Sequence, residues 1–205
     1  MNLDDLKVYL PKYLSVESER ELFNGLKDFP HNIDERLYTH YLKDSELIYQ
    51  GDGLKDLLVV NLPEKEIGAA PGIILSNTCD IDIHNKRFFN SRVVYAPIFN
   101  LDKYKKNLIS NSQKSEEQIS SHISSIRKQE ITQVFYLPGN QGRLDESIVF
   151  LDRLNNMPND LIVRDNVKNL RLFTLSDYGA YLFVLKLSIH FTRIQDKVER
   201  KGSLI

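Results

Sequence analysis

Six side chains that can take part in chemistry lie within nine positions of the chain: Ser76, Thr78, Cys79, Asp80, Asp82 and His84. Cys79 and His84 are the residue types of a nucleophilic pair, because an imidazole can take the proton of a nearby thiol. Asp80, Asp82 and His84 alternate along the chain, so on an extended strand they would share one face. A face of carboxylates and an imidazole can bind a divalent cation. The cluster is therefore compatible with two functions. The first is catalysis, by a nucleophile or by an acid and a base, and the second is binding of a metal ion.

Each chemistry has a simpler structural alternative. A lone cysteine is often a small buried residue, so we expect Cys79 to lie with Ile81 and Ile83 on the core face of a strand. The three ionisable residues of the opposite face would then be edge charges that discourage sheet pairing. We prefer this arrangement and predict no metal ion and no other cofactor. If either Cys79 or Asp80 is functional, we expect it to be Asp80.

Basic residues beside aromatic ones follow directly after this cluster. Arg87 and Arg92 flank Phe88 and Phe89, and cations with stacking rings can hold a nucleic-acid strand. The alternative is that at least one ring packs in the core while the arginines stay on the surface. The candidate binding residues are therefore Ser76, Thr78, Asp80, Asp82 and Arg92.

If the protein is an enzyme, the cluster favours phosphodiester cleavage. His84 would act as general acid or base, and Arg87 or Arg92 would stabilise phosphate charge. The candidate catalytic residues are therefore Asp80, His84 and Arg87. A second, weaker basic and aromatic pattern occurs at Lys103 and Tyr104. For Arg153 we expect an ion pair with a carboxylate such as that of Asp152 or Asp80.

Composition restricts the partners. The chain has 205 residues, 41% of them hydrophobic, with a net charge of −1 and one cysteine. Any contact with RNA or DNA must therefore be local, since no overall basic field exists. No apolar run reaches the roughly 20 residues that span a bilayer. We expect a cytoplasmic protein that binds a partner protein or nucleic acid and does not bind a membrane. Formation of a homodimer is compatible with the sequence.

The elements that must position these residues are short strands between helical segments. Branched and aromatic residues predict strands near 46–50, 57–60, 73–75, 93–95, 134–137, 147–151 and 170–175, with a polar loop over 64–70. Helical spacing predicts an N-terminal cover over 1–44 and a final helix over 176–198, capped by Ser176. Residues 101–130 read as a polar insertion whose helix carries Ile119, Ile123 and Ile126. The pattern predicts an α+β fold with a small, bent, mostly antiparallel barrel over 45–205.

The order of these pieces resembles the PemK/MazF-like small barrels, the SH3-like fold of many toxin–antitoxin ribonucleases. The matching segments are 51–52, 71–76, 93–98, 148–154 and 175–176. In that family an Arg precedes the second segment and a Thr or Ser follows the third, and both contact the scissile phosphate. Here those places hold Ala69, Ala70 and Pro71, and Phe99 and Asn100.

The resemblance therefore implies the barrel without the catalytic pair of the family. It implies a binding or accessory factor of a toxin–antitoxin or phage-defence type system, acting on protein or nucleic acid. The alternative is a nuclease, possessing endoribonuclease-like chemistry, that uses the cluster at 76–84.

Overall fold

The computed structural model of the chain describes residues 35–140 and 142–192, together with the separate positions 17, 20, 22, 24, 25, 29 and 33. Most of the predicted N-terminal cover, and the predicted helix beyond Thr192, lie outside the described residues. The division of the chain at residue 44 therefore stays a prediction. Leu22 is buried and belongs to the main core, so at least this residue of the cover packs on the rest of the molecule.

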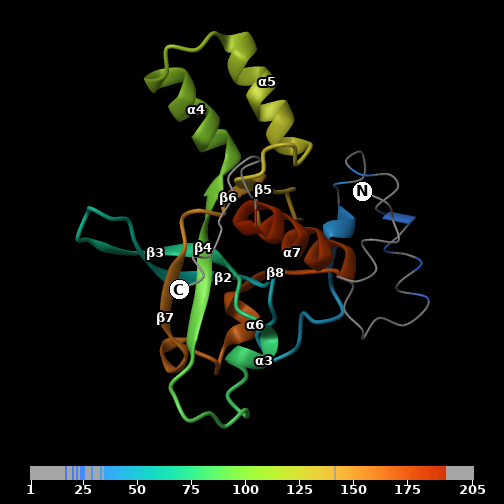
Figure 1. The fold of residues 1–205 in the computed structure, drawn as a ribbon, viewed down its shortest axis with the longest axis vertical. Helices are drawn as coiled ribbons and strands as arrows, with labels where there is room; N and C mark the ends of the chain where they lie inside the picture. Colours follow the sequence, from blue (N-terminus) through green and yellow to red (C-terminus); the bar gives the residue numbers. More distant parts are fainter. Residues whose placement is uncertain are drawn as a thin grey trace, which may run out of the picture.

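The described chain forms an α+β fold, which confirms the predicted class (Figure 1). Its strands are β1 (Tyr38–Thr39), β2 (Gly53–Val60), β3 (Ile67–Ile74), β4 (Arg92–Asn100), β5 (Val134–Leu137), β6 (Ser147–Phe150), β7 (Asn155–Pro158) and β8 (Arg171–Leu175). Its α-helices are α3 (Thr78–Ile81), α4 (Leu101–Asn111), α5 (Glu116–Arg127), α6 (Val167–Leu170) and α7 (Asp177–Thr192), and short 3-10 turns form η2 (Glu35–Leu37) and η3 (Asn159–Leu161).

All pairings in the eight-stranded sheet are antiparallel, as predicted. The strands follow the order β1-β8-β2-β3-β4-β6-β5, and β7 pairs with β4. The predicted barrel is not closed, because β1 and β5 at the two ends of this path do not pair. β4 is the centre of the arrangement, since it pairs with β3, β6 and β7.

The strand predicted over 46–50 is wrong: this segment is a bend without strand pairing. The buried Arg171 guanidinium binds carbonyls at its start instead, since it donates to Ser45 O at 2.8 Å and also to Leu47 O. Arg171 further pairs with the buried Asp52 carboxylate at 3.1 Å. The loop predicted over 64–70 is also too long, because β3 already begins at Ile67.

The strand predicted through the cysteine cluster is a single helical turn, α3. Asn77 caps it, since its side-chain oxygen accepts from the Cys79 N–H at 2.9 Å. A helical turn breaks the alternation, so Cys79 and Ile83 are exposed while Ile81 is buried. The prediction that Cys79 is buried is therefore wrong.

The predicted insertion is helical, but it holds two helices rather than one. Ser115 and Gln118 form a reciprocal capping box that begins α5. The predicted stripe of Ile119, Ile123 and Ile126 is buried, which confirms it. α4 and α5 run together as a helical hairpin away from the sheet (Figure 1). The hairpin continues β4 directly, so it stands at the end of β4 where Asn100 lies.

The main core lies between the sheet and α7. The Phe135 and Phe183 rings meet at 5.1 Å, and α7 buries Tyr178 and Leu182 against this core, while Ile189 near its end is exposed. Ser176 caps α7 as predicted, because its hydroxyl oxygen accepts from the Gly179 N–H at 3.1 Å. No helix in the described part of the chain has the length and apolar character needed to cross a membrane.

Candidate nucleic-acid interface

β3 and β4 separate at one end of the sheet and leave a cavity between them. Their pairing runs from Ile74 and Tyr95 to Gly72 and Pro97 and is not continued beyond that pair. The residues before Gly72 and after Pro97 instead line a cavity of about 840 Å³, whose other walls come from β2, α4, β8, and β6 with the turns on either side of it. This volume is typical of a ligand-binding cleft.

The cavity carries a net positive charge. Its charged lining residues are four cations and two carboxylates, namely Lys55, Lys103, Arg143, Arg153, Asp56 and Asp145. None of the four cations forms an ion pair with a described residue. Lys55 comes from an irregularity in β2, where the register shifts and Asp56 has a φ of 58°. Such bulges turn side chains out of the regular strand pattern.

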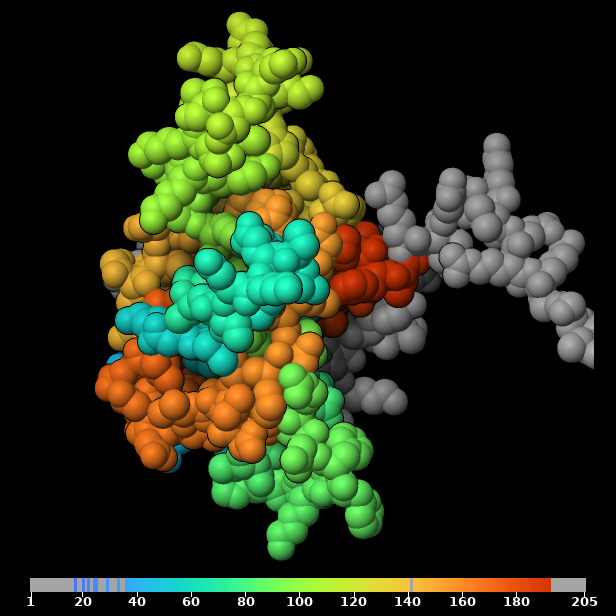
Figure 2. All heavy atoms as spheres, turned by 90° about the vertical axis from the view of Figure 1, so that its left-hand side faces the viewer, coloured from blue at the N-terminus to red at the C-terminus, as the bar shows by residue number. Residues whose placement is uncertain are grey.

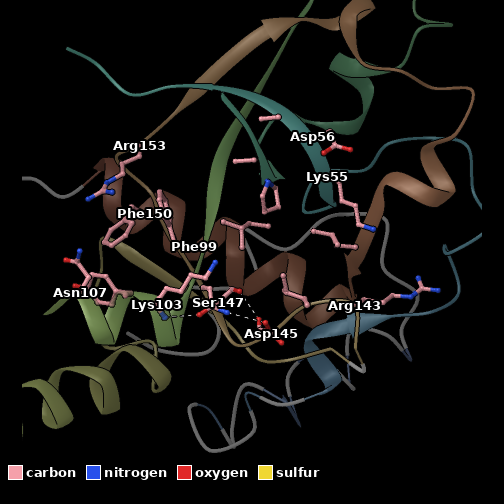
Figure 3. Close-up of a pocket in the computed structure, with 18 residues that line it drawn as sticks. Lys55, Asp56, Phe99, Lys103, Asn107, Arg143, Asp145, Ser147, Phe150 and Arg153 are labelled. Atoms are coloured by element: carbon pink, nitrogen blue, oxygen red, sulfur yellow. Dashed lines mark hydrogen bonds between the residues drawn. The ribbon is translucent and has the colours of Figure 1, made fainter. Parts of the chain in front are cut away.

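An aromatic group forms one end of the cavity. The Arg153 guanidinium carbon lies 4.1 Å from the centroid of the Phe150 ring and 5.4 Å from that of Phe99. Tyr104 meets Phe150 edge-on at 5.7 Å. Figure 3 shows Arg153, Phe150 and Phe99 on one side, with Lys55 and Arg143 toward the other. The ion pair expected for Arg153 is therefore wrong, because this side chain stacks on aromatic rings.

Hydrogen bonds fix the floor of the cavity. The Asn100 side chain accepts from the Lys103 N–H at 2.9 Å, which caps α4, and donates to the Asp145 carboxylate at 3.3 Å. The Tyr104 hydroxyl lies 3.0 Å from His122 Nε2 on α5. Burial raises the pKa of Tyr104, although the charge of Arg153 opposes the shift. Tyr104 is therefore a neutral hydrogen-bonding group at physiological pH.

A charged clamp holds the helical hairpin against this end of the sheet. The Arg127 guanidinium binds both oxygens of the Glu146 carboxylate, at 2.9 and 2.7 Å, and the Tyr136 hydroxyl donates to the same group at 2.5 Å. The hydrogen bond from Arg127 is the main reason that the pKa of Glu146 is lowered. The clamp joins α5 to the start of β6, next to Asp145 and Ser147 of the cavity.

The predicted cluster at 76–84 lies elsewhere, around α3, and its hydroxyls serve the fold. The Val94 N–H donates to Ser76 Oγ at 2.8 Å, and the Gln50 N–H donates to Thr78 Oγ1 at 3.0 Å. Asp80 and Arg87, both proposed as catalytic, form an exposed ion pair of 2.7 Å.

Asp82 and His84 line a second, smaller cavity of about 660 Å³. Among the described residues, no group of three or more His, Cys, Asp or Glu side chains is arranged to hold a metal ion. Arg92 donates to the Asn156 side chain at 2.5 Å. The expectation that Phe88 or Phe89 packs in the core is wrong, since both rings are exposed.

Sequence reasoning found only part of the large cavity. It noted the basic and aromatic pair of Lys103 and Tyr104, which does line it. It missed Lys55, Arg143 and Phe150, which come from three distant segments and carry no local motif. The five residues at the two catalytic places of the resemblance also line this cavity.

Neither the models of known protein families nor the curated proteins contain a match to this chain. The resemblance therefore stays a prediction, and the function has to follow from the chemistry of the residues themselves.

Proposed function

We propose that this chain binds single-stranded nucleic acid in the large cavity without cutting it, as a PemK/MazF-like accessory factor of a toxin–antitoxin or phage-defence type system. The observation that supports this is the lining of the cavity, where four cations without ion-pair partners among the described residues stand beside three aromatic rings. Cations contact phosphates in any sequence, and rings accept the faces of unpaired bases.

The two ends of the cavity suit different parts of a strand. At the aromatic end, the exposed Arg153 guanidinium lies over the Phe150 ring, and such a cation–ring group can stack with a base, as arginine does in RNA recognition. Lys55 and Arg143 stand toward the opposite end, where they would contact phosphates (Figure 3). A single strand that crosses the cavity would therefore place a base against Arg153 and Phe150 at one end and phosphates near Lys55 and Arg143 at the other.

The absence of cleavage follows from what replaces the catalytic pair in the resemblance. Ala69, Ala70 and Pro71 have no side chain that can contact a phosphate, and Asn100 is engaged with Lys103 N–H and Asp145. The SH3-like character of the sheet belongs to the same proposal. It is supported by the pairing of the two matching segments, in which Ile73 of β3 lies opposite Ala96 of β4.

Fluorescence anisotropy with labelled single-stranded RNA and DNA tests the proposal. We expect binding, and the double substitution Lys103→Gln and Arg153→Gln should weaken it at least about tenfold, since one stacked base alone is worth about 1–3 kcal/mol. Arg92→Gln is the matched control, because Arg92 lies at the other end of β4. Equal affinity of the double variant and the wild type would contradict the proposal.

The same samples distinguish binding from cleavage. After incubation with Mg²⁺ or Mn²⁺ the strands should stay intact on a denaturing gel. Strand cleavage that disappears in Asp80→Asn and in His84→Ala would instead establish the nuclease hypothesis. The RNA and DNA arms show which of the two nucleic acids binds more tightly.

A further inference from the structure

The loop between α3 and β4 presents an uncovered apolar tip. Phe88 and Phe89 are 111% and 69% exposed, and Ile83 is 57% exposed. In both views the loop projects from the end of the molecule opposite the α4–α5 hairpin (Figures 1 and 2). Scattered exposed apolar residues are ordinary, but two adjacent phenylalanine rings on a projecting loop mark an interaction site.

Polar bonds hold this loop in place on both sides of the rings. Arg87 donates to the Asp80 carboxylate at 2.7 Å and to Cys79 O at 3.1 Å, and Asn85 donates to Cys79 O at 2.7 Å. On the other side, the Asn159 backbone N–H donates to Ser91 O at 3.0 Å. The two rings are thus held outward by a fixed loop, which reduces the entropy lost on binding.

A cavity of complementary character lies beside the tip. This is the 660 Å³ cavity lined by Asp82 and His84, and it shares Ile83 with the tip. Its apolar lining residues are Leu47, Ile48, Ile81 and Ile83. Its charged lining residues are the three carboxylates of Glu46, Asp82 and Asp165 and one cation, Arg164, whose guanidinium already donates to backbone carbonyls of its own molecule. Phe88 and Phe89 do not line the cavity of their own molecule. The face therefore carries an aromatic tip, with Lys86 two positions before it in the chain, and an apolar cavity whose border is acidic on balance, with three carboxylates against one cation.

We propose that a second copy of this chain covers this face, with the Phe88 and Phe89 rings of each copy in the cavity of the other. Because tip and cavity adjoin, one two-fold rotation can bring each tip over the opposite cavity, as in an isologous dimer. Lys86 of each copy then faces the carboxylates of its neighbour. Those carboxylates would repel the phosphates of nucleic acid and of anionic lipid, so a protein partner fits the face better.

The area available is sufficient for a specific dimer. A buried phenylalanine removes about 150–250 Å² from water, so four rings remove about 600–1,000 Å². The cavity walls lose a similar area, and the total of about 1,200–2,000 Å² is that of a standard protein interface. The large cavity lies at the other end of β4, so this dimer leaves the proposed nucleic-acid interface open in both copies.

Sedimentation velocity from low to high micromolar concentration tests the dimer. The wild type should dimerise, and the double substitution Phe88→Ala and Phe89→Ala should raise the dimer Kd by about thirtyfold or more, as expected for interface hot spots. These rings are exposed in the monomer, so the variant should keep the wild-type circular dichroism. Tyr41→Ala, at an aromatic residue that is 98% exposed in another part of the chain, should leave the Kd unchanged.

Charge exchange tests the pairing of tip and cavity. Asp165→Lys should weaken the dimer, and addition of Lys86→Glu in the same chain should restore part of the loss. A wild type that stays monomeric at every concentration would overturn the proposal, as would a dimer that tolerates loss of both rings.

A tryptophan reporter identifies the occupant of the tip. The chain contains no tryptophan, so Phe88→Trp gives a single emitter at the tip. Its emission should shift to the blue as protein concentration rises. A shift that requires single-stranded RNA, or vesicles of phosphatidylcholine and phosphatidylglycerol, would overturn the second copy as occupant.

Discussion

Replacing Lys103 by glutamine should make nucleic-acid binding less dependent on salt by a calculable amount. Apart from Arg153, which stacks on Phe150, three cations line the large cavity, and each can neutralise one phosphate. Binding of a single strand then releases counterions, and log K should fall with log salt concentration with a slope of about −0.7 per phosphate, or about −2.1 in total. Removal of Lys103 leaves two such cations and a slope of about −1.4.

The assay is anisotropy titration of one labelled strand over a series of salt concentrations. Lys106→Gln is the matched control on the same helix, because Lys106 pairs with Asp102 at 2.6 Å and does not line the cavity. Its slope should stay that of the wild type. An unchanged slope for Lys103→Gln, or an equal change for Lys106→Gln, would refute the assignment of phosphates to the cavity.

Three further predictions concern stability. Arg171→Met should lower the free energy of unfolding by about 3–5 kcal/mol in urea titrations, because it leaves the buried Asp52 carboxylate without its cation; a loss under about 1 kcal/mol would show that the pair is dispensable. Cys79→Ala should change the free energy of unfolding by no more than about 0.5 kcal/mol, because the thiol is exposed. A larger loss of stability would contradict that exposure. The stability gap between wild type and Glu146→Gln should begin to close as pH falls below about 4.5, the ordinary glutamate pKa. A carboxyl with a lowered folded pKa contributes its full stability above its unfolded pKa and loses it as pH falls toward the folded pKa. A gap that stays constant down to pH 3 would exclude the hydrogen bond from Arg127 as its source.

The sequence predicted those strands well whose structure is determined by the residues of the strand itself. Of the residues predicted as strands at 73–75, 93–95 and 134–137, all but Leu75, which directly follows β3, lie in strands of the structure. The stripe at Ile119, Ile123 and Ile126 was also confirmed, because polar residues around it leave one helical face to bury. In these segments local propensity and tertiary packing favour the same structure.

The strand predictions fail where a distant residue or a helix cap determines the local structure. The bend at 46–50 takes its hydrogen bonds from Arg171, more than 120 positions away, which no local pattern can reveal. The alternation of Asp80, Ile81 and Asp82 suggested a strand, although Asn77 before it was a visible helix cap. Most of the large cavity was missed because Lys55, Arg143 and Phe150 come from distant segments that only the folded chain brings together.

Cross-linking of a bound strand tests the central claim most directly. A single strand containing thiouridine is irradiated with the protein, and the linked peptides are identified by mass spectrometry. Binding in the large cavity predicts cross-links at Phe99, Tyr104 and Phe150, which surround its stacking end. Cross-links confined to residues 76–92, at the other end of β4, would contradict the assignment of nucleic-acid binding to this cavity.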